Sequence, residues 1–172
     1  MRVVFLGTPA FAVPSLISLA EHDKIDVGLV VTQPDRPAGR GRKLTPPAVK
    51  AAANALGLWV YQPDSLRDNG TLQTLRDARP DLLIVVAYGE LLRRDMLELA
   101  PAGCLNVHPS LLPAYRGAAP IPAAILNGDR MSGVSLIKLV RKLDAGPIVA
   151  QVEVVVLPGD TAGSLGERLA GV

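Results

Sequence analysis

Short apolar runs alternate with helix-like segments along this 172-residue chain, and no other feature constrains its fold as strongly. The runs expected to be strands are β-branched or aliphatic and are closed by Gly, Pro or polar residues. They are Val3–Leu6, Val27–Thr32, Leu82–Ala87 and Leu105–His108, a weaker run at Trp59–Tyr61, and later runs at Val134–Lys138 and Ile148–Val155. The expected helices are Val13–Glu21, Pro46–Leu56, Thr71–Arg76, Arg93–Leu99, Ala118–Leu126 and Thr161–Leu169. This alternation predicts an α/β fold, a doubly wound and mostly parallel sheet with helices on both faces.

The composition fits that fold class. Hydrophobic residues make up 49% of the chain but aromatic residues only 3%, so the core is aliphatic, as in buried parallel strands. Thr45 followed by Pro46 and Pro47 is typical of an N-cap and a first helical turn. The single cysteine, Cys104, excludes an intramolecular disulfide and fits a small core residue. With neither a signal peptide nor a membrane-length apolar run, the sequence predicts a soluble, cytoplasmic protein, which we expect to be a monomer with no membrane partner.

Open α/β sheets bind ligands beyond the carboxyl ends of their strands. That rule directs attention to Gly7–Phe11, Thr32–Lys43 and Asn106–Gly117. The first of these has one glycine and a proline where a dinucleotide-binding turn needs G-x-G-x-x-G, so a nucleotide-dependent dehydrogenase is disfavoured. The P-loop pattern is also absent.

Cations gather in the second of these stretches, although the net charge of the chain is only +2. The stretch contains one acid, Asp35, and four cations: Arg36, Arg40, Arg42 and Lys43. An exposed, solubilising loop would have this composition, and so would a loop that reaches a phosphate backbone.

The third stretch holds the strongest catalytic candidates. Asn106 and His108 alternate at the end of a strand, so both side chains leave on one face. The amide is a hydrogen-bond donor, and the imidazole changes charge near neutral pH. Asp144 is the best acidic partner, because Gly146 and Pro147 restrict its loop, whereas Asp129 and Asp160 look like turn formers. His22 looks like a surface residue, and the two histidines and one cysteine have no metal-site spacing.

These residues resemble a known family, the folate-dependent formyltransferases. The resemblance rests on Asn106, His108, the stretch Ser110–Pro113, Arg116-Gly117 and Asp144. Four further stretches resemble the branch of the family that formylates methionyl-tRNA: Gly7–Pro14, Gln33–Gly41, Val85–Gly89 and Arg116–Ile121. The resemblance runs from Arg2 to about Leu169, with two departures. Pro109 stands where a small residue is usual, and Val140-Arg141-Lys142 stands where the family tends to have an acid and a glycine.

The resemblance implies a Rossmann-like formyltransferase fold, with residues 1–172 as the catalytic domain and the family's C-terminal, tRNA-binding β-domain absent. It implies formyl transfer from 10-formyltetrahydrofolate, as cosubstrate, to the amino group of initiator methionyl-tRNA, for translation initiation. Asn106, His108 and Asp144 would be catalytic, and no metal would be needed. The stretch Ser110, Leu111, Leu112 and Pro113 would bind folate, and backbone groups after Val86 would meet the pterin. Arg40, Arg42 and Lys43 would bind tRNA.

Several alternatives remain open. A related formyltransferase could act on a sugar nucleotide or on glycinamide ribonucleotide, although a small substrate has no need of the basic loop. A formyltetrahydrofolate hydrolase would release formate without an amine. A folate- or RNA-binding module would show no turnover at all.

Overall fold

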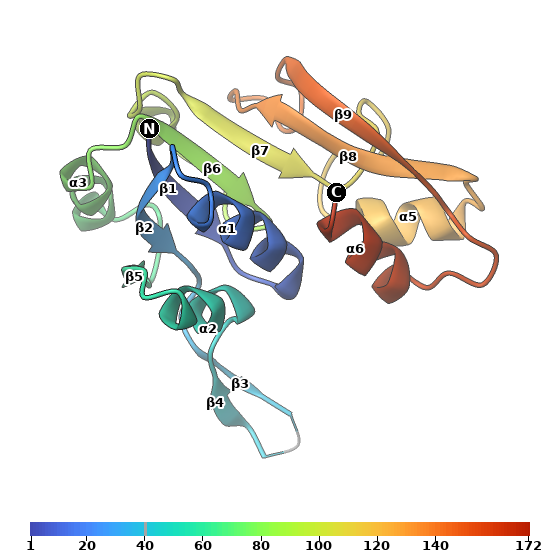
Figure 1. The fold of residues 1–172 in the computed structure, drawn as a ribbon, viewed down its shortest axis with the longest axis horizontal. Coiled ribbons are helices and arrows are strands. Elements are labelled where there is room, and N and C mark those ends of the chain that lie inside the picture. The colour runs from blue at the N-terminus through green and yellow to red at the C-terminus, as the bar shows by residue number, and fades with distance from the viewer. Residues whose placement is uncertain (40) are drawn as a thin grey trace. The chain divides into compact units, whose positions relative to one another are not determined.

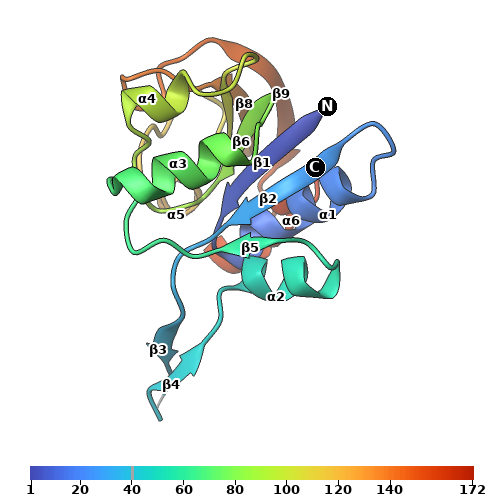
Figure 2. The same ribbon diagram turned by 90° about the vertical axis from the view of Figure 1, so that its left-hand side faces the viewer.

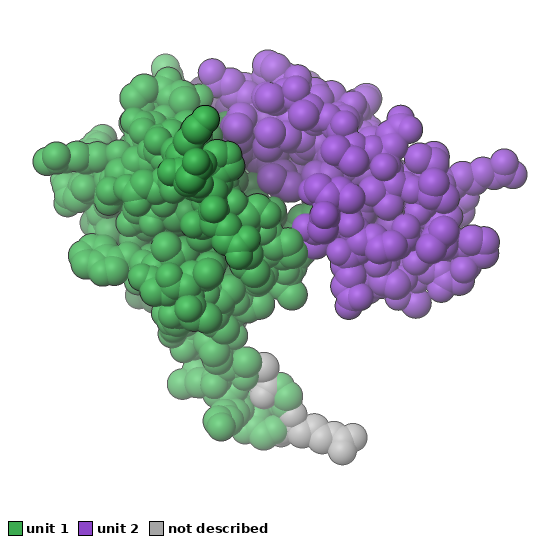
Figure 3. Space-filling view, viewed as in Figure 1, with its two compact units in different colours: residues 1–104 green, residues 105–172 purple. Residues whose placement is uncertain are grey.

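The computed structural model describes residues 1–39 and 41–172 of the chain. These residues form two compact units, residues 1–104 and residues 105–172, which are coloured separately in Figure 3.

In the first unit, four strands lie side by side in the order β5-β2-β1-β6. They are β1 (Arg2–Gly7), β2 (Asp26–Val31), β5 (Val60–Tyr61) and β6 (Leu82–Val86), and each adjacent pair is parallel. Residues Val3–Leu6 and Leu82–Val86 are buried. Continuous apolar runs of this kind are what a strand covered on both faces requires.

Helices cover both faces of these strands. The 3-10 turn η1 (Ala10–Ala12) leads into α1 (Val13–Ala20), which contacts α2 (Ala48–Ala55) on one face, and α3 (Asn69–Asp77) lies on the other (Figure 2). The short α4 (Arg94–Leu97) follows β6. The Asp68 side chain caps α3 by accepting a hydrogen bond from the backbone of Gly70 at 3.2 Å. The predicted α/β class, with its helices on both faces, is therefore confirmed.

The basic stretch is not an irregular loop. It forms an antiparallel hairpin of β3 (Arg36–Ala38) and β4 (Lys43–Thr45), which projects from the first unit (Figure 1). The expected cap at Thr45 is wrong, because Thr45 lies in β4 and α2 begins three residues later, after Pro47. A residue that precedes proline is kept out of helical backbone angles, so the two prolines hold the chain extended up to Ala48.

The second unit is antiparallel. Its strands are β7 (Cys104–His108), which begins at the last residue of the first unit, β8 (Met131–Lys138) and β9 (Ile148–Val155). β8 begins three residues earlier than the sequence indicates, because Gly133 lies inside it. A Cβ atom at Gly133 would lie 2.2 Å from the Val152 carbonyl oxygen, so this strand position needs a glycine.

Two helices complete the second unit, α5 (Pro120–Leu126) and α6 (Ala162–Ala170), and they contact each other. A reciprocal capping box starts α6. The Thr161 hydroxyl accepts a bond from the Ser164 backbone at 3.2 Å, and the Ser164 hydroxyl accepts one from the Thr161 backbone at 3.0 Å. None of the helices in the described part of the chain is long and apolar enough to span a membrane.

Candidate active site

The second unit contains a buried histidine–carboxylate pair. His108 ends β7, and Asp144 lies in the turn between β8 and β9, residues 139–147. The His108 Nδ1 and Asp144 Oδ2 atoms are 3.7 Å apart, and each side chain is only 6% exposed. The separation is too long for a direct hydrogen bond but within ion-pair range. The structure therefore brings His108 and Asp144 together, and their catalytic roles stay a prediction.

The loop 109–119 supplies the other contacts of this pair. The Gly117 backbone N–H donates to Asp144 Oδ2 at 2.9 Å, and His108 Nε2 lies 2.9 Å from the carbonyl oxygen of Tyr115. A carbonyl can only accept, so Nε2 is the nitrogen that carries the proton. Nδ1 is then the nitrogen that faces the carboxylate.

Asp144 and Tyr115 hold unusual backbone angles, with φ of 45° and 55°. Non-glycine residues in this left-handed region are strained, and such residues concentrate at functional sites. Both lie within the contacts just described, which supports a functional assignment for the pair.

Asn106 lies two residues before His108 on β7, so the two side chains share a face. It is half-buried, and no described residue forms a hydrogen bond with its side-chain amide. The amide is therefore available as a donor to a ligand.

The stretch Ser110–Pro113 is fastened to the sheet of the second unit. The Ser135 hydroxyl on β8 donates to the Ser110 carbonyl at 2.6 Å and accepts from the Leu112 backbone N–H at 3.0 Å. Gln151 on β9 donates to the Leu112 carbonyl at 3.0 Å and to the Ser135 hydroxyl at 2.8 Å. The Ser110 hydroxyl itself donates to the Ala114 carbonyl at 2.6 Å. In this arrangement Ser110 holds the loop together, and its contact with folate stays a prediction.

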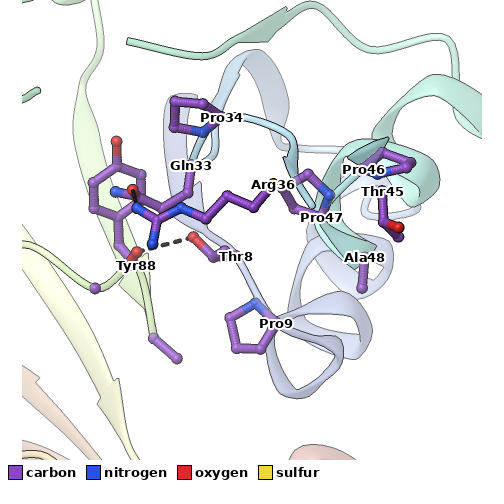
Figure 4. Close-up of a pocket in the computed structure, with 12 residues that line it drawn as sticks. Thr8, Pro9, Gln33, Pro34, Arg36, Thr45, Pro46, Pro47, Ala48 and Tyr88 are labelled. Carbon is purple, nitrogen blue, oxygen red and sulfur yellow. Dashed lines mark hydrogen bonds between the residues drawn. The ribbon is translucent and has the colours of Figure 1, made fainter. Parts of the chain in front are cut away.

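A separate pocket of about 470 Å³ lies in the first unit (Figure 4). Its walls come from the carboxyl ends of β1, β2 and β6 and include Thr8, Gln33, Arg36 and Tyr88. This cavity is lined by residues of Gly7–Phe11 and Thr32–Lys43, two of the three stretches in which ligand binding is expected at strand ends. The segment after Val86 lines it as well. The Thr8 hydroxyl donates to the Tyr88 carbonyl at 2.9 Å, which braces the pocket wall.

Tyr88 is almost fully buried, and burial together with the nearby Glu90 carboxylate raises its pKa to about 12. Among the described residues, none forms a hydrogen bond with its hydroxyl. The tyrosine is therefore a neutral wall of this pocket at physiological pH.

The hairpin is anchored by a polar cluster at its base. Lys50 pairs with Asp35 at 2.8 Å, and the Gln62 amide donates to Asp35 at 2.7 Å. The hydrogen bond from Gln62, followed by that from Lys50, lowers the pKa of Asp35. Arg42 and Lys43 are exposed and have no ionic partner in the part of the chain that the structure describes. Arg40, the third residue predicted to bind tRNA, lies outside the described residues.

The residues rejected as catalysts have other roles. Asp129 accepts a hydrogen bond from the Tyr115 hydroxyl at 2.6 Å. Asp160 accepts one from the Leu157 backbone N–H, which lowers the pKa of that carboxyl, and it pairs with Arg168. His22 is half exposed.

Within the described residues, no group of three His, Cys, Asp or Glu side chains could hold a metal ion.

Sequence reasoning missed four contributors to the site: the Gly117 N–H, the Tyr115 carbonyl, Ser135 and Gln151. The first two are backbone groups, which carry no signature of their own in a sequence. Ser135 gave one available signal, since it is a polar residue between two aliphatic residues, Val134 and Leu136, in the middle of the strand.

Comparison with known proteins settles the family. The family model described as "Formyl transferase" matches residues 1–172. The chain belongs to the formyl transferase family. It is 52% identical over 169 residues to methionyl-tRNA formyltransferase from Chloroflexus aggregans, a match that covers 98% of this chain and 54% of that protein. It is 52% identical over 171 residues to methionyl-tRNA formyltransferase from Halorhodospira halophila, a match that covers 99% of this chain and 54% of that protein.

A solved structure also shares the fold. The crystal structure of glycinamide ribonucleotide transformylase 1 from Symbiobacterium toebii matches with a TM-score of 0.80 and 24% identity, over 99% of this chain and 80% of that one. This likeness supports the fold alone. The chain spans about half the length of the two relatives above, 54% in each case.

Proposed function

We propose that this chain carries the formyl-transfer centre of an enzyme that formylates methionyl-tRNA from 10-formyltetrahydrofolate. The buried His108–Asp144 pair beside the available amide of Asn106 is the observation that supports it most directly. The identity of 52% to two methionyl-tRNA formyltransferases favours methionyl-tRNA as the acceptor.

In the proposed reaction, the amine nitrogen attacks the formyl carbon and the carbonyl electron pair moves onto oxygen. The Asn106 amide donates to that developing oxyanion. His108 donates a second hydrogen bond from Nε2–H, and to do so it exchanges the Tyr115 carbonyl for the substrate oxygen. One such donor typically lowers the barrier by about 2.7–4 kcal/mol.

The amine must lose a proton and the leaving nitrogen of the folate must gain one. Asp144 is an acceptor that faces His108 and is held in place by the Gly117 N–H. It takes the amine proton through a water molecule and passes a proton by the same route to the folate nitrogen. The oxyanion electron pair then re-forms the carbonyl, and the bond from the formyl carbon to the protonated folate nitrogen breaks. Positioned proton transfer of this kind contributes roughly 10²–10⁴-fold in rate.

The binding residues are proposed on the same basis. Ser110, Leu111, Leu112 and Pro113 lie on the braced loop beside the catalytic pair and would contact folate. Arg42 and Lys43 lie on the exposed hairpin, and together with Arg40 they would contact tRNA phosphates.

The test is an acceptor comparison. The chain is incubated with 10-formyltetrahydrofolate and either methionyl-tRNA, glycinamide ribonucleotide or no amine, and the formylated product and released formate are quantified. We expect formyl-methionyl-tRNA. Formylation of glycinamide ribonucleotide instead would support the activity named for the structural relative, and formate release without an amine would identify a hydrolase.

A further inference from the structure

The turn between β8 and β9 carries only positive charge on its surface. Lys138 ends β8, and Arg141 and Lys142 follow in the turn; all three are exposed. Its one acid, Asp144, is buried and directed at His108 and Gly117. The loop 109–119 adds one more exposed cation, Arg116, and contains no acid. We call these four cations the basic rim.

None of the four side chains forms an ion pair or a hydrogen bond within the residues that the structure describes. Two other cations behave differently: Arg168 of the same unit pairs with Asp160, and Arg94 of the first unit pairs with Glu98. The basic rim is therefore an uncompensated positive surface. Such a surface raises the local concentration of an anionic ligand and attracts it over a Debye length.

Internal contacts place the basic rim at the catalytic pair. The hydrogen bond from Gly117 to Asp144 joins the two segments that carry it. The Lys138 backbone N–H donates to the Pro147 carbonyl at 2.9 Å and closes the turn, and the Ala145 N–H donates to the Lys142 carbonyl at 3.3 Å. Arg116 is next to Gly117 in sequence, and Lys142 is two residues from Asp144.

We propose that the basic rim binds backbone phosphates of a nucleic-acid acceptor immediately beside its reacting end. This inference rests on the proposed function. The amino group of an amino acid that is esterified to the terminal ribose of an RNA lies within one nucleotide of the last phosphodiester. Cations at the margin of the catalytic pair therefore meet phosphate when the amine is in place. Arg and Lys side chains are the usual protein donors to phosphate oxygens, and they position a strand without reading its sequence.

The experiment compares two charge reversals on one strand. Arg141→Glu changes the basic rim. Arg130→Glu makes the same change at an exposed arginine that precedes β8, at the end of that eight-residue strand opposite to the turn that carries Arg141. Binding of a fluorescent acceptor-stem RNA hairpin with a single-stranded CCA end is measured by anisotropy over a series of KCl concentrations. Tetrahydrofolate binding, with one and with several glutamyl residues, is measured in parallel.

We expect Arg141→Glu to weaken RNA binding and to make the plot of log affinity against log salt shallower by about one unit, because one phosphate is no longer neutralised. Arg130→Glu and both folate affinities should stay as in the parent chain. Unchanged RNA binding in Arg141→Glu, or an equal loss in Arg130→Glu, overturns the inference. A loss confined to the polyglutamyl folate also overturns it and assigns the basic rim to the folate tail.

Binding and turnover are read separately, so the two proposals can fail separately. If the parent chain formylates methionyl-tRNA but the two variants bind RNA alike, the proposed function is supported. The proposed contact between the basic rim and phosphate is then wrong. If RNA binding depends on Arg141 while no formyl transfer is seen, the contact between the basic rim and phosphate is supported. The proposed function is then wrong.

Discussion

Asp144 illustrates how a single residue is held in a costly conformation. Its backbone occupies the left-handed region at φ 45°, which disfavours any residue with a Cβ atom. The Gly117 N–H bond and the closed turn hold it there. The result is a buried carboxylate with one oxygen directed at both Gly117 and His108.

Replacing either donor should remove most of the catalysis. We expect Asn106→Ala to lower kcat by about 10²–10³, and His108→Ala at least as much, because each removes a hydrogen bond that forms fully only with the oxyanion. Steady-state formylation assays on variants with parental circular dichroism and thermal midpoint check this. A variant that keeps near-parental kcat would remove that residue from the mechanism.

The single cysteine should be inert in the native protein. Burial raises the pKa of Cys104 to about 12, and only the thiolate reacts with disulfide reagents. At pH 8 its thiolate fraction is about one in ten thousand, and the fraction rises only as pH approaches 12. We expect slow reaction with a chromogenic disulfide in buffer and rapid, stoichiometric reaction in denaturant. Rapid reaction in buffer would show that Cys104 is accessible.

At the level of elements, the turn between β8 and β9 depends on a glycine. A Cβ atom at Gly146 would lie 1.7 Å from the Lys138 carbonyl oxygen, which is backbone and cannot rotate away. Gly146→Ala should therefore destabilise the protein by about 1–3 kcal/mol and lower kcat by displacing Asp144. Urea denaturation and formylation assays check both effects.

Gly163→Ala is the matched control in the same unit. A Cβ atom there meets only the Thr161 hydroxyl at 3.5 Å, and alanine is the better helix former in α6. It should leave kcat unchanged and stability equal or slightly higher. Similar losses in the two variants would show that any added methyl group is harmful here, and the turn would have no special role.

The β3–β4 hairpin should serve tRNA and not folate. Arg42→Ala should raise KM for methionyl-tRNA, and Arg40→Ala should do the same. Each variant should also make the slope of log tRNA affinity against log salt shallower, by about one unit for each phosphate that is no longer neutralised. Folate KM should stay constant. Lys24→Ala, at an exposed cation outside the hairpin, is the control. A variant that loses folate affinity and keeps tRNA affinity would reassign the hairpin.

At the scale of the whole molecule, the chain has all three proposed catalytic residues but little net charge. Affinity for a polyanion grows with the number of phosphates neutralised, and the net charge here is +2. The two relatives are nearly twice as long as the matched region. We expect a fusion of this chain to the remaining part of such a relative to have a much lower KM for methionyl-tRNA, with unchanged folate binding. Equal KM values for tRNA would show that these 172 residues carry all of the recognition.

Sequence alone determined the elements and the catalytic candidates. Runs such as Val3–Leu6 are short, apolar and bounded by turn residues, and those properties are local, so most strands and helices could be predicted within a few residues. The β3–β4 hairpin was missed, because its stretch contains no apolar run. Asn106 and His108 could be paired because alternation along a strand is also a local rule. Asp144 could be selected as their acidic partner because Gly146 and Pro147 restrict its loop, and the resemblance to the family pointed to the same residue.

Only the tertiary structure decided what surrounds those residues. Gly117 and Asp144 are 27 residues apart, and Ser135 and Leu112 are 23 apart. Contacts over such separations depend on how β7, β8 and β9 pair, and that pairing has no local signature. Backbone donors and acceptors are the same in every residue type, so the Gly117 N–H and the Tyr115 carbonyl were invisible in the sequence. The basic rim has the same origin, because Arg116 and Arg141 become one surface only when a hydrogen bond joins the loop to the turn.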